Sequence, residues 1–84
     1  MSELVMHPNI GKVLDSKLDA VGIRTYDQLK KTGSKKAWLL MKAIDDSICI
    51  NCLYDLEGAI RGIRKTDLPE DIRSELKNYY NAHK

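Results

Sequence analysis

The sequence lacks the features of a membrane or secreted protein. No apolar run approaches the roughly 18 residues that a membrane-spanning helix requires, and the N-terminal residues do not show the basic and then apolar pattern of a signal peptide. The two cysteines are too few to imply a disulfide framework. We therefore expect a cytoplasmic protein that does not interact with a membrane.

The sequence also has little that points to catalysis. Its two histidines lack a neighbouring carboxylate and nucleophile, and it contains no glycine-rich phosphate-binding loop. The acidic pairs Asp45-Asp46 and Glu70-Asp71 lie in loops or at expected helix starts, where capping and the helix dipole account for them. We expect that the protein is not an enzyme and that it needs no cofactor.

The two cysteines, Cys49 and Cys52, have the Cys-x-x-Cys spacing of zinc sites and thiol redox centres. A tetrahedral zinc site needs two more ligands, and the candidates His7 and His83 lie near opposite ends of the chain. A thiol redox motif would be expected in a strand and helix unit, which this sequence does not predict. We interpret the pair as small buried residues at a helix entrance, with a metal or redox role as the lesser alternative.

The composition is that of a small globular protein, but the charge is unevenly distributed. Of the 84 residues 43% are hydrophobic and 31% are charged, so we expect a single domain with one core, spanning residues 1–84. Residues 10–42 contain eight Lys or Arg against three Asp, whereas residues 43–84 contain six basic and eight acidic residues. A basic half of this kind can hold a polyanion electrostatically.

Proline and glycine are few, and they fall where the apolar periodicity stops, which predicts short helices. The first expected helix has the apolar stripe Val13, Leu14, Leu18 and Val21 and ends at Gly22. The second and third expected helices span residues 26–31 and 34–44. The fourth has the apolar stripe Leu53, Leu56, Ile60 and Ile63, and the last starts between Asp67 and Pro69. Residues 48–51 are expected to be a loop that enters a helix. These elements predict an all-α fold, a compact bundle of about five short helices.

Several residues carry more local expectations. Thr25 and Ser34 are the expected N-caps of the second and third helices, because a hydroxyl can accept a hydrogen bond from an amide of the first turn. Gly58 and Gly62 each cost about 1 kcal/mol inside a helix. Since residues four apart share one helix face, we expect another helix to approach closely there. Trp38 is expected to anchor the core or its rim.

The segment Pro8-Asn9-Ile10-Gly11-Lys12, followed by a helix and then by Gly22-Ile23-Arg24-Thr25, resembles a helix-hairpin-helix signature. In that family a Pro-x-x-Gly turn opens one helix and a Gly-Ile-x-Thr junction starts the next. The resemblance implies a helix-hairpin-helix-like N-terminal half in which residues Asn9, Ile10, Gly11 and Lys12 meet a phosphate group. Asn9 stands where the family usually has glycine, and asparagine tolerates a left-handed backbone better than most residues.

The second half of the chain extends the resemblance. The run from Asn51 to Gly62 (NCLYDLEGAIRG), followed by Asp67-Leu68-Pro69, looks like the C-terminal domain of the TfoX/Sxy family of competence regulators. The likeness covers nearly the whole chain and implies a compact five-helix domain with a role in regulating DNA uptake or transcription. Full regulators of that family carry a separate N-terminal domain, so this chain is expected to be a stand-alone version or to obtain that domain from another chain.

We therefore predict a non-enzymatic helical binding module that contacts the DNA backbone without strong sequence preference. The predicted contact residues are Asn9, Ile10, Gly11, Lys12, Arg24, Lys30, Lys31, Lys35 and Lys36. The alternative is a module that binds a partner protein or a second copy of itself, because aromatic anchors dominate such interfaces. Its predicted contacts form an exposed surface around Trp38, Tyr54, Tyr79 and Tyr80.

Overall fold

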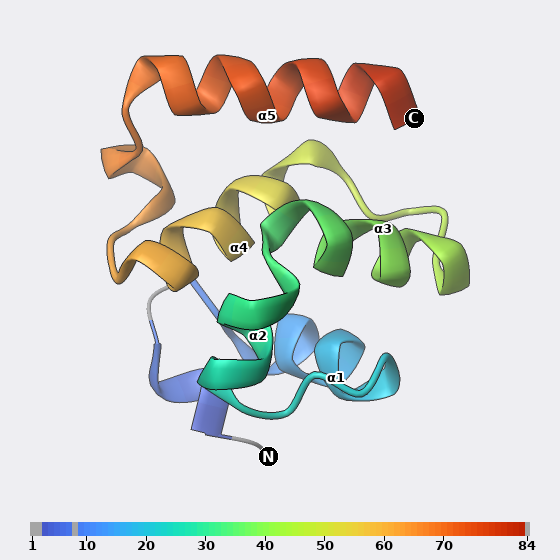
Figure 1. The fold of residues 1–84 in the computed structure, drawn as a ribbon. Coiled ribbons are helices and arrows are strands. Elements are labelled where there is room, and N and C mark those ends of the chain that lie inside the picture. The colour runs from blue at the N-terminus through green and yellow to red at the C-terminus, as the bar shows by residue number, and fades with distance from the viewer. Residues whose placement is uncertain (1–2, 8, 84) are drawn as a thin grey trace.

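The computed structural model describes residues 3–7 and 9–83 and is built from helices (Figure 1). The elements are two short 3-10 helices, Glu3–Met6 and Lys65–Asp67, and five α-helices: α1 (Lys12–Ala20), α2 (Tyr26–Thr32), α3 (Ser34–Ile44), α4 (Ile50–Arg61) and α5 (Glu70–His83). Among the described residues no β-strand is present. The predicted all-α fold with about five short helices is therefore confirmed. The loop predicted over residues 48–51 is shorter than expected, because Ile50 and Asn51 already belong to α4.

The five α-helices pack together in a compact arrangement. In Figure 1, α5 lies across one side of the molecule above α3 and α4, and α1 and α2 lie on the opposite side. α4 contacts α2, α3 and α5, so it is the central helix, as its regular apolar stripe predicts. None of the helices formed by the described residues is long and apolar enough to span a membrane.

The core is one cluster of buried apolar side chains with Trp38 at full burial. The Trp38 ring packs in a T-shaped geometry with the rings of Tyr79 and Tyr80, with centroid distances of 6.3 and 5.6 Å. The expectation that Trp38 anchors the core is confirmed. Its assignment to an exposed interaction surface is wrong, because 0% of the residue is accessible and the helical packing encloses it.

The starts of α2 and α3 are held in different ways. At α2, the Gln28 amide donates to Thr25 Oγ1 over 3.1 Å and Gln28 Oε1 accepts from the Thr25 amide, which completes a capping box and confirms Thr25 as the N-cap. Ser34 is the first residue of α3 and does not cap it; Gly33 precedes the helix. The Ser34 hydroxyl is buried and instead donates to Glu57 of α4 over 2.6 Å.

The two glycines of the central helix have separate roles. A Cβ atom at Gly58 would lie 2.8 Å from the carbonyl oxygen of Ile63 and would also collide with the Asn9 side-chain nitrogen. The predicted close approach at Gly58 is therefore confirmed, although the neighbour is a turn and not another helix. The same prediction is wrong for Gly62, which lies just beyond α4 and ends it in the left-handed conformation with φ of 74°.

Candidate functional site

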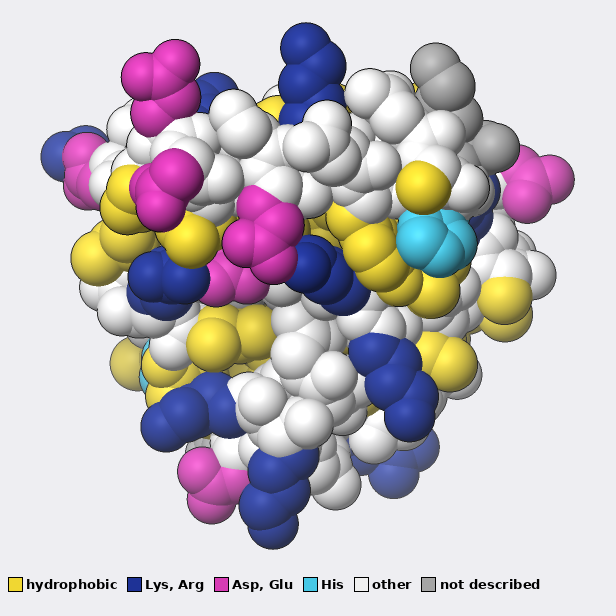
Figure 2. All heavy atoms as spheres, turned by 45° about the horizontal axis from the view of Figure 1, so that its top comes forward, with side chains coloured by type: hydrophobic (Ala, Val, Ile, Leu, Met, Phe, Trp, Pro, Cys, Tyr) yellow, Lys and Arg dark blue, Asp and Glu magenta, His cyan; other side chains and the backbone are white. Residues whose placement is uncertain are grey.

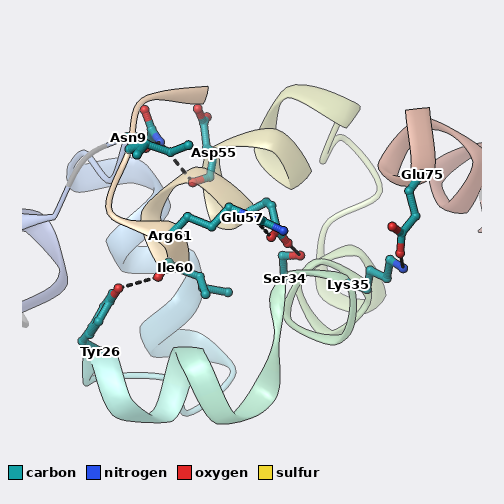
Figure 3. A network of polar contacts seen from close by, with 10 residues as sticks. Asn9, Tyr26, Ser34, Lys35, Asp55, Glu57, Ile60, Arg61 and Glu75 are labelled. Carbon is teal, nitrogen blue, oxygen red and sulfur yellow. Dashed lines mark hydrogen bonds and ion pairs between the residues drawn. The ribbon is translucent and has the colours of Figure 1, made fainter. Parts of the chain in front are cut away.

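Hydrogen bonds from the Asn9 side chain join the turn before α1 to the C-terminal part of α4 and the turn that follows it (Figure 3). Asn9 has φ of 70°, as its replacement of a glycine implies, and its Nδ2 donates to the carbonyl oxygens of Ile63 at 3.0 Å and Asp55 at 3.4 Å. Its Oδ1 accepts from the amide of Lys65 at 3.2 Å. We call these contacts, together with Gly58 beneath them, the Asn9 junction. The Asn9 side chain is committed to the fold and is not offered to a phosphate.

The other residues of the hairpin resemblance are divided between core and surface. Pro8 lies outside the described residues, and Ile10 is buried with 5% of its surface accessible, so its side chain belongs to the core. Gly11 and Lys12 are exposed at the start of α1, where the described residues provide no side-chain cap. Lys12 and the first amides of α1 are thus the part of this segment that faces solvent.

The basic residues of the first half fall into two groups. Three have carboxylate partners: Lys17 pairs with Asp45, Arg24 with Asp19 and Lys35 with Glu75. Within the part of the chain that the structure describes, the remaining five have no ion pair: Lys12, Lys30, Lys31, Lys36 and Lys42. Two of the predicted contact residues, Arg24 and Lys35, are therefore already neutralised by local partners.

Three of the unpaired lysines lie close together along the chain. Lys30 and Lys31 are in the last turn of α2 and Lys36 is in the first turn of α3, with the positive-φ residue Gly33 between them. All three are exposed. We call Lys30, Lys31 and Lys36 the α2–α3 lysine cluster. Basic side chains also predominate in the lower half of the face drawn in Figure 2, whereas acidic side chains gather in its upper half.

A shallow pocket of about 440 Å³ adjoins this cluster at the start of α3. Its wall includes Glu57, which accepts hydrogen bonds from Ser34 at 2.6 Å and from Arg61 Nε at 2.5 Å (Figure 3). Glu57 thus forms an i,i+4 ion pair with Arg61 and also bonds the first residue of α3. Because its oxygens already face two donors, Glu57 presents little free negative charge to the pocket.

A second, more apolar groove of about 520 Å³ lies between α1 and α4. Its lining includes Val13, Leu14 and Lys17 of α1 and Cys52 and Asp55 of α4. Val13 is 72% exposed, so its expected place in the buried stripe of the first helix is wrong. The helix turns Val13 outward beside Leu14, which is buried, and two adjacent residues of one helix face different directions.

The predicted aromatic interaction surface is not assembled as an exposed patch. Tyr79 and Tyr80 are half-buried and pack against Trp38. Tyr54 is also half-buried, with the Arg73 guanidinium 5.1 Å from its ring centroid. Among the side chains that the structure describes, the large apolar ones that are exposed are instead Met6, Val13, Leu40 and Ile44. Sequence periodicity could not identify Val13 as exposed, because it continues an apolar pattern that normally indicates burial.

The two cysteines stand at the start of α4. Cys49 is the N-cap residue and is exposed, whereas Cys52, in the first turn, is half-buried in the α1–α4 groove. Burial raises the pKa of the Cys52 thiol. The predicted position at a helix entrance is confirmed, but the expectation that both cysteines are buried is wrong for Cys49.

Two carboxyl groups near this region have shifted pKa values with different causes. Hydrogen bonds from Lys17 and Ser47 lower the pKa of Asp45 to about 2. Burial raises the pKa of Asp55, and Lys65, whose Nζ lies 3.3 Å away, partly opposes that effect. Asp45 thus stays ionised while holding α1 to the loop before α4, and Asp55 contributes its backbone carbonyl oxygen to the Asn9 junction.

Comparison with known proteins adds what the geometry alone does not provide. Residues 1–80 match the model of the TfoX C-terminal domain family. Protein Sxy of Escherichia coli (strain K12) is 35% identical to this chain over 75 residues, which is 89% of this chain and 36% of Sxy. The chain therefore spans about a third of the length of that relative.

Two solved structures share the fold closely. An uncharacterised protein from Listeria monocytogenes, in a triclinic crystal form, is 46% identical with a TM-score of 0.93 over 94% of this chain and 90% of its own. A protein of unknown function from Listeria monocytogenes, in a tetragonal form, is 44% identical with a TM-score of 0.95 over 98% of this chain and 100% of its own. Sequence and fold agree, and the chain belongs to the TfoX C-terminal domain family.

Proposed function

We propose that this protein is a competence-regulator-like binding domain that contacts the nucleic-acid backbone through the α2–α3 lysine cluster and Lys12, without catalysing a reaction. The observation that carries the proposal is that these four lysines are exposed and have no ion pair among the described residues. Phosphate contacts from lysines supply affinity and position but no sequence readout. The expected partner is therefore duplex DNA of any sequence.

The structure narrows the set of residues that the proposal uses. Arg24 and Lys35 each face a carboxylate, at 2.6 and 2.5 Å, so they would have to exchange an existing ion pair for a phosphate. Asn9 and Ile10 are occupied by the Asn9 junction and the core. Lys12 differs from the cluster because it lies beside the uncapped start of α1, where amides and the helix dipole also attract an anion.

The proposal is tested by titrating the purified protein into a labelled generic duplex at several salt concentrations, with fluorescence anisotropy as the readout. A triple variant, Lys30→Gln, Lys31→Gln and Lys36→Gln, removes the cluster but leaves the Lys35–Glu75 pair in place. The matched control removes the same number of charges elsewhere, by Arg64→Gln, Arg73→Gln and Lys77→Gln. Circular dichroism establishes that both variants remain folded.

We expect wild-type binding that weakens with salt and a salt slope that falls by about 3 in the cluster variant, because each phosphate contact contributes roughly 0.9 to the slope. The control variant should keep most of its affinity. Equal losses in the two variants would mean that net charge alone drives binding. Failure of the wild-type protein to bind at low salt would overturn the proposal for this chain.

A protein partner or a second copy of the chain remains the second candidate function. The observation that favours it is the α1–α4 groove beside Val13, since an exposed valine at an apolar groove is a typical docking feature. Sedimentation over a range of concentrations measures self-association directly. A larger species that disappears in a Val13→Ser variant would support this candidate, whereas an unchanging monomer would exclude self-association through the groove.

A further inference from the structure

The start of α4 brings two thiols into one helical turn. Cys49 is the N-cap, and the amide of Cys52 donates to the Cys49 carbonyl oxygen over 3.1 Å, which fixes the turn that joins them. The two cysteines are therefore three residues apart across the first turn of the helix. Residues separated in this way have Cα atoms about 5 Å apart, which is within the range that a disulfide bridges without backbone movement.

The two sulfurs differ in their access to solvent. Cys49 is exposed, and no side-chain hydrogen bond from it caps the start of α4. Cys52 is half-buried at the edge of the α1–α4 groove, and burial raises the pKa of its thiol. An external reagent therefore meets Cys49 first, and Cys52 stands behind it in the position of a resolving thiol.

The surroundings favour disulfide chemistry over metal binding. Within residues 3–7 and 9–83, no group of three or more His, Cys, Asp or Glu side chains is arranged to hold a metal ion. A tetrahedral thiolate site needs four ligands, and this turn supplies two. A disulfide, in contrast, needs only the two sulfurs that the turn already brings together.

We propose that Cys49 and Cys52 form a dithiol–disulfide centre that is oxidised by low-molecular-weight disulfides in the native protein. The Cys49 thiolate attacks the reagent disulfide, forming a mixed disulfide and releasing one reagent thiol. The Cys52 thiolate then attacks the Cys49 sulfur, forming the internal disulfide and releasing the second reagent thiol. Two protein thiols are oxidised while one reagent disulfide is reduced to two thiols.

This centre is independent of the proposed DNA contact, because it uses neither Lys12 nor the α2–α3 lysine cluster. Each of the two cysteines nevertheless contacts another part of the fold. The Cys49 carbonyl oxygen accepts a hydrogen bond from Trp38 Nε1 at 3.1 Å, and Cys52 lines the α1–α4 groove. Oxidation would therefore alter the wall of that groove while the backbone bond to Trp38 holds the turn in place.

The test treats the folded, reduced protein with glutathione disulfide, blocks the remaining thiols with an alkylating reagent under denaturing conditions, and measures the intact mass. We expect wild-type protein to lose both alkylatable thiols and the mass of two hydrogen atoms, as a monomer. The Cys52→Ser variant should stop at a mixed disulfide between glutathione and Cys49. Circular dichroism before and after oxidation establishes that the fold is retained.

Three results would overturn the proposal. The first is a glutathione adduct that persists on Cys49 of the wild-type protein, because Cys52 would then fail to resolve it. The second is an internal disulfide that forms only when urea is added, which would mean that the native turn does not bring the sulfurs together. The third is a dimer linked between chains as the main product. None of these outcomes depends on whether the protein binds DNA.

Discussion

The two ends of α4 are constructed in opposite ways. Its C-terminal end, at the Asn9 junction, is closed by hydrogen bonds from one side chain to three backbone groups and leaves no space for a Cβ atom at Gly58. Its N-terminal end starts at the exposed Cys49, with no side-chain cap among the described residues. The contacts at the C-terminal end of α4 stabilise the fold, whereas the N-terminal end leaves the Cys49 thiol accessible to reagents in solution.

The largest test of this contrast is Gly58→Ala at the closed end. The added methyl group meets the Ile63 carbonyl oxygen at 2.8 Å and displaces the Asn9 side chain, so we expect a loss of about 3 kcal/mol in the free energy of unfolding. This outweighs the gain of about 1 kcal/mol in helix propensity. Urea denaturation followed by circular dichroism measures it. Ser16→Ala on the exposed face of α1 is the control, and equal stability of the two variants would refute a closed junction.

Two substitutions of Asn9 separate the contribution of its side-chain hydrogen bonds from the effect of its left-handed backbone conformation. Asn9→Ala removes three hydrogen bonds and forces an alanine to adopt φ of 70°, with an expected loss of about 2 kcal/mol. Asn9→Gly loses the same bonds but accepts the backbone conformation, so it should be more stable than the alanine variant by about 1 kcal/mol. The same urea experiment compares them. If the glycine variant matches wild type, the side-chain bonds contribute nothing.

The pH dependence of stability probes the loop before the open end. The folded pKa of Asp45 is about 2, below its ordinary value of 3.8, so its contribution is fully present above that ordinary value and is lost as pH falls toward 2. Thermal melts over this range should show a steeper loss for wild type than for Asp45→Asn. Asp46→Asn, at the exposed neighbouring position, should follow wild type. Parallel curves for wild type and Asp45→Asn would contradict the assignment.

The smallest expected effect is a gain in the free energy of unfolding from a substitution at the N-terminal end of α4. Cys49→Ser places a hydroxyl oxygen at the N-cap of α4, where it can accept from a backbone amide of the first turn, and should stabilise the protein by roughly 0.5–1 kcal/mol. Cys49→Ala lacks that acceptor and serves as the matched control in the same urea titration. A serine variant no more stable than the alanine variant would show that this helix start does not benefit from a cap.

Much of the fold follows from local signals that need no knowledge of the neighbouring helices. Thr25 could be predicted as a cap because Gln28, three residues later, completes a local motif. Ser34 is also a hydroxyl residue before an apolar helical stripe, but its hydroxyl is buried against α4, where it donates to Glu57 and does not accept from an amide of the first turn of α3. Tertiary contact, which the sequence does not display, decided between two similar residues.

The candidate site was less predictable than the fold for the same reason. Charge along the chain identified the basic half, but only the spatial neighbours show that Arg24 and Lys35 are in ion pairs. The same neighbours show that Lys30, Lys31 and Lys36 form no ion pair with any described residue. The spacing of Cys49 and Cys52 was visible, whereas the exposure of Cys49 depends on where α4 begins. Composition and spacing identify the basic and thiol side chains that could form a site, and packing decides which of these side chains remain accessible.

The bond between the indole nitrogen of Trp38 and the Cys49 carbonyl oxygen gives the molecule an optical reporter. Trp38 is the single tryptophan in the chain, so all of the indole emission comes from one fully buried ring. Its nitrogen lies 3.1 Å from the carbonyl oxygen of Cys49, the N-cap of α4 and one of the two thiol residues. Its emission maximum and lifetime therefore report on both global unfolding and the local state of the α4 start, without any added dye.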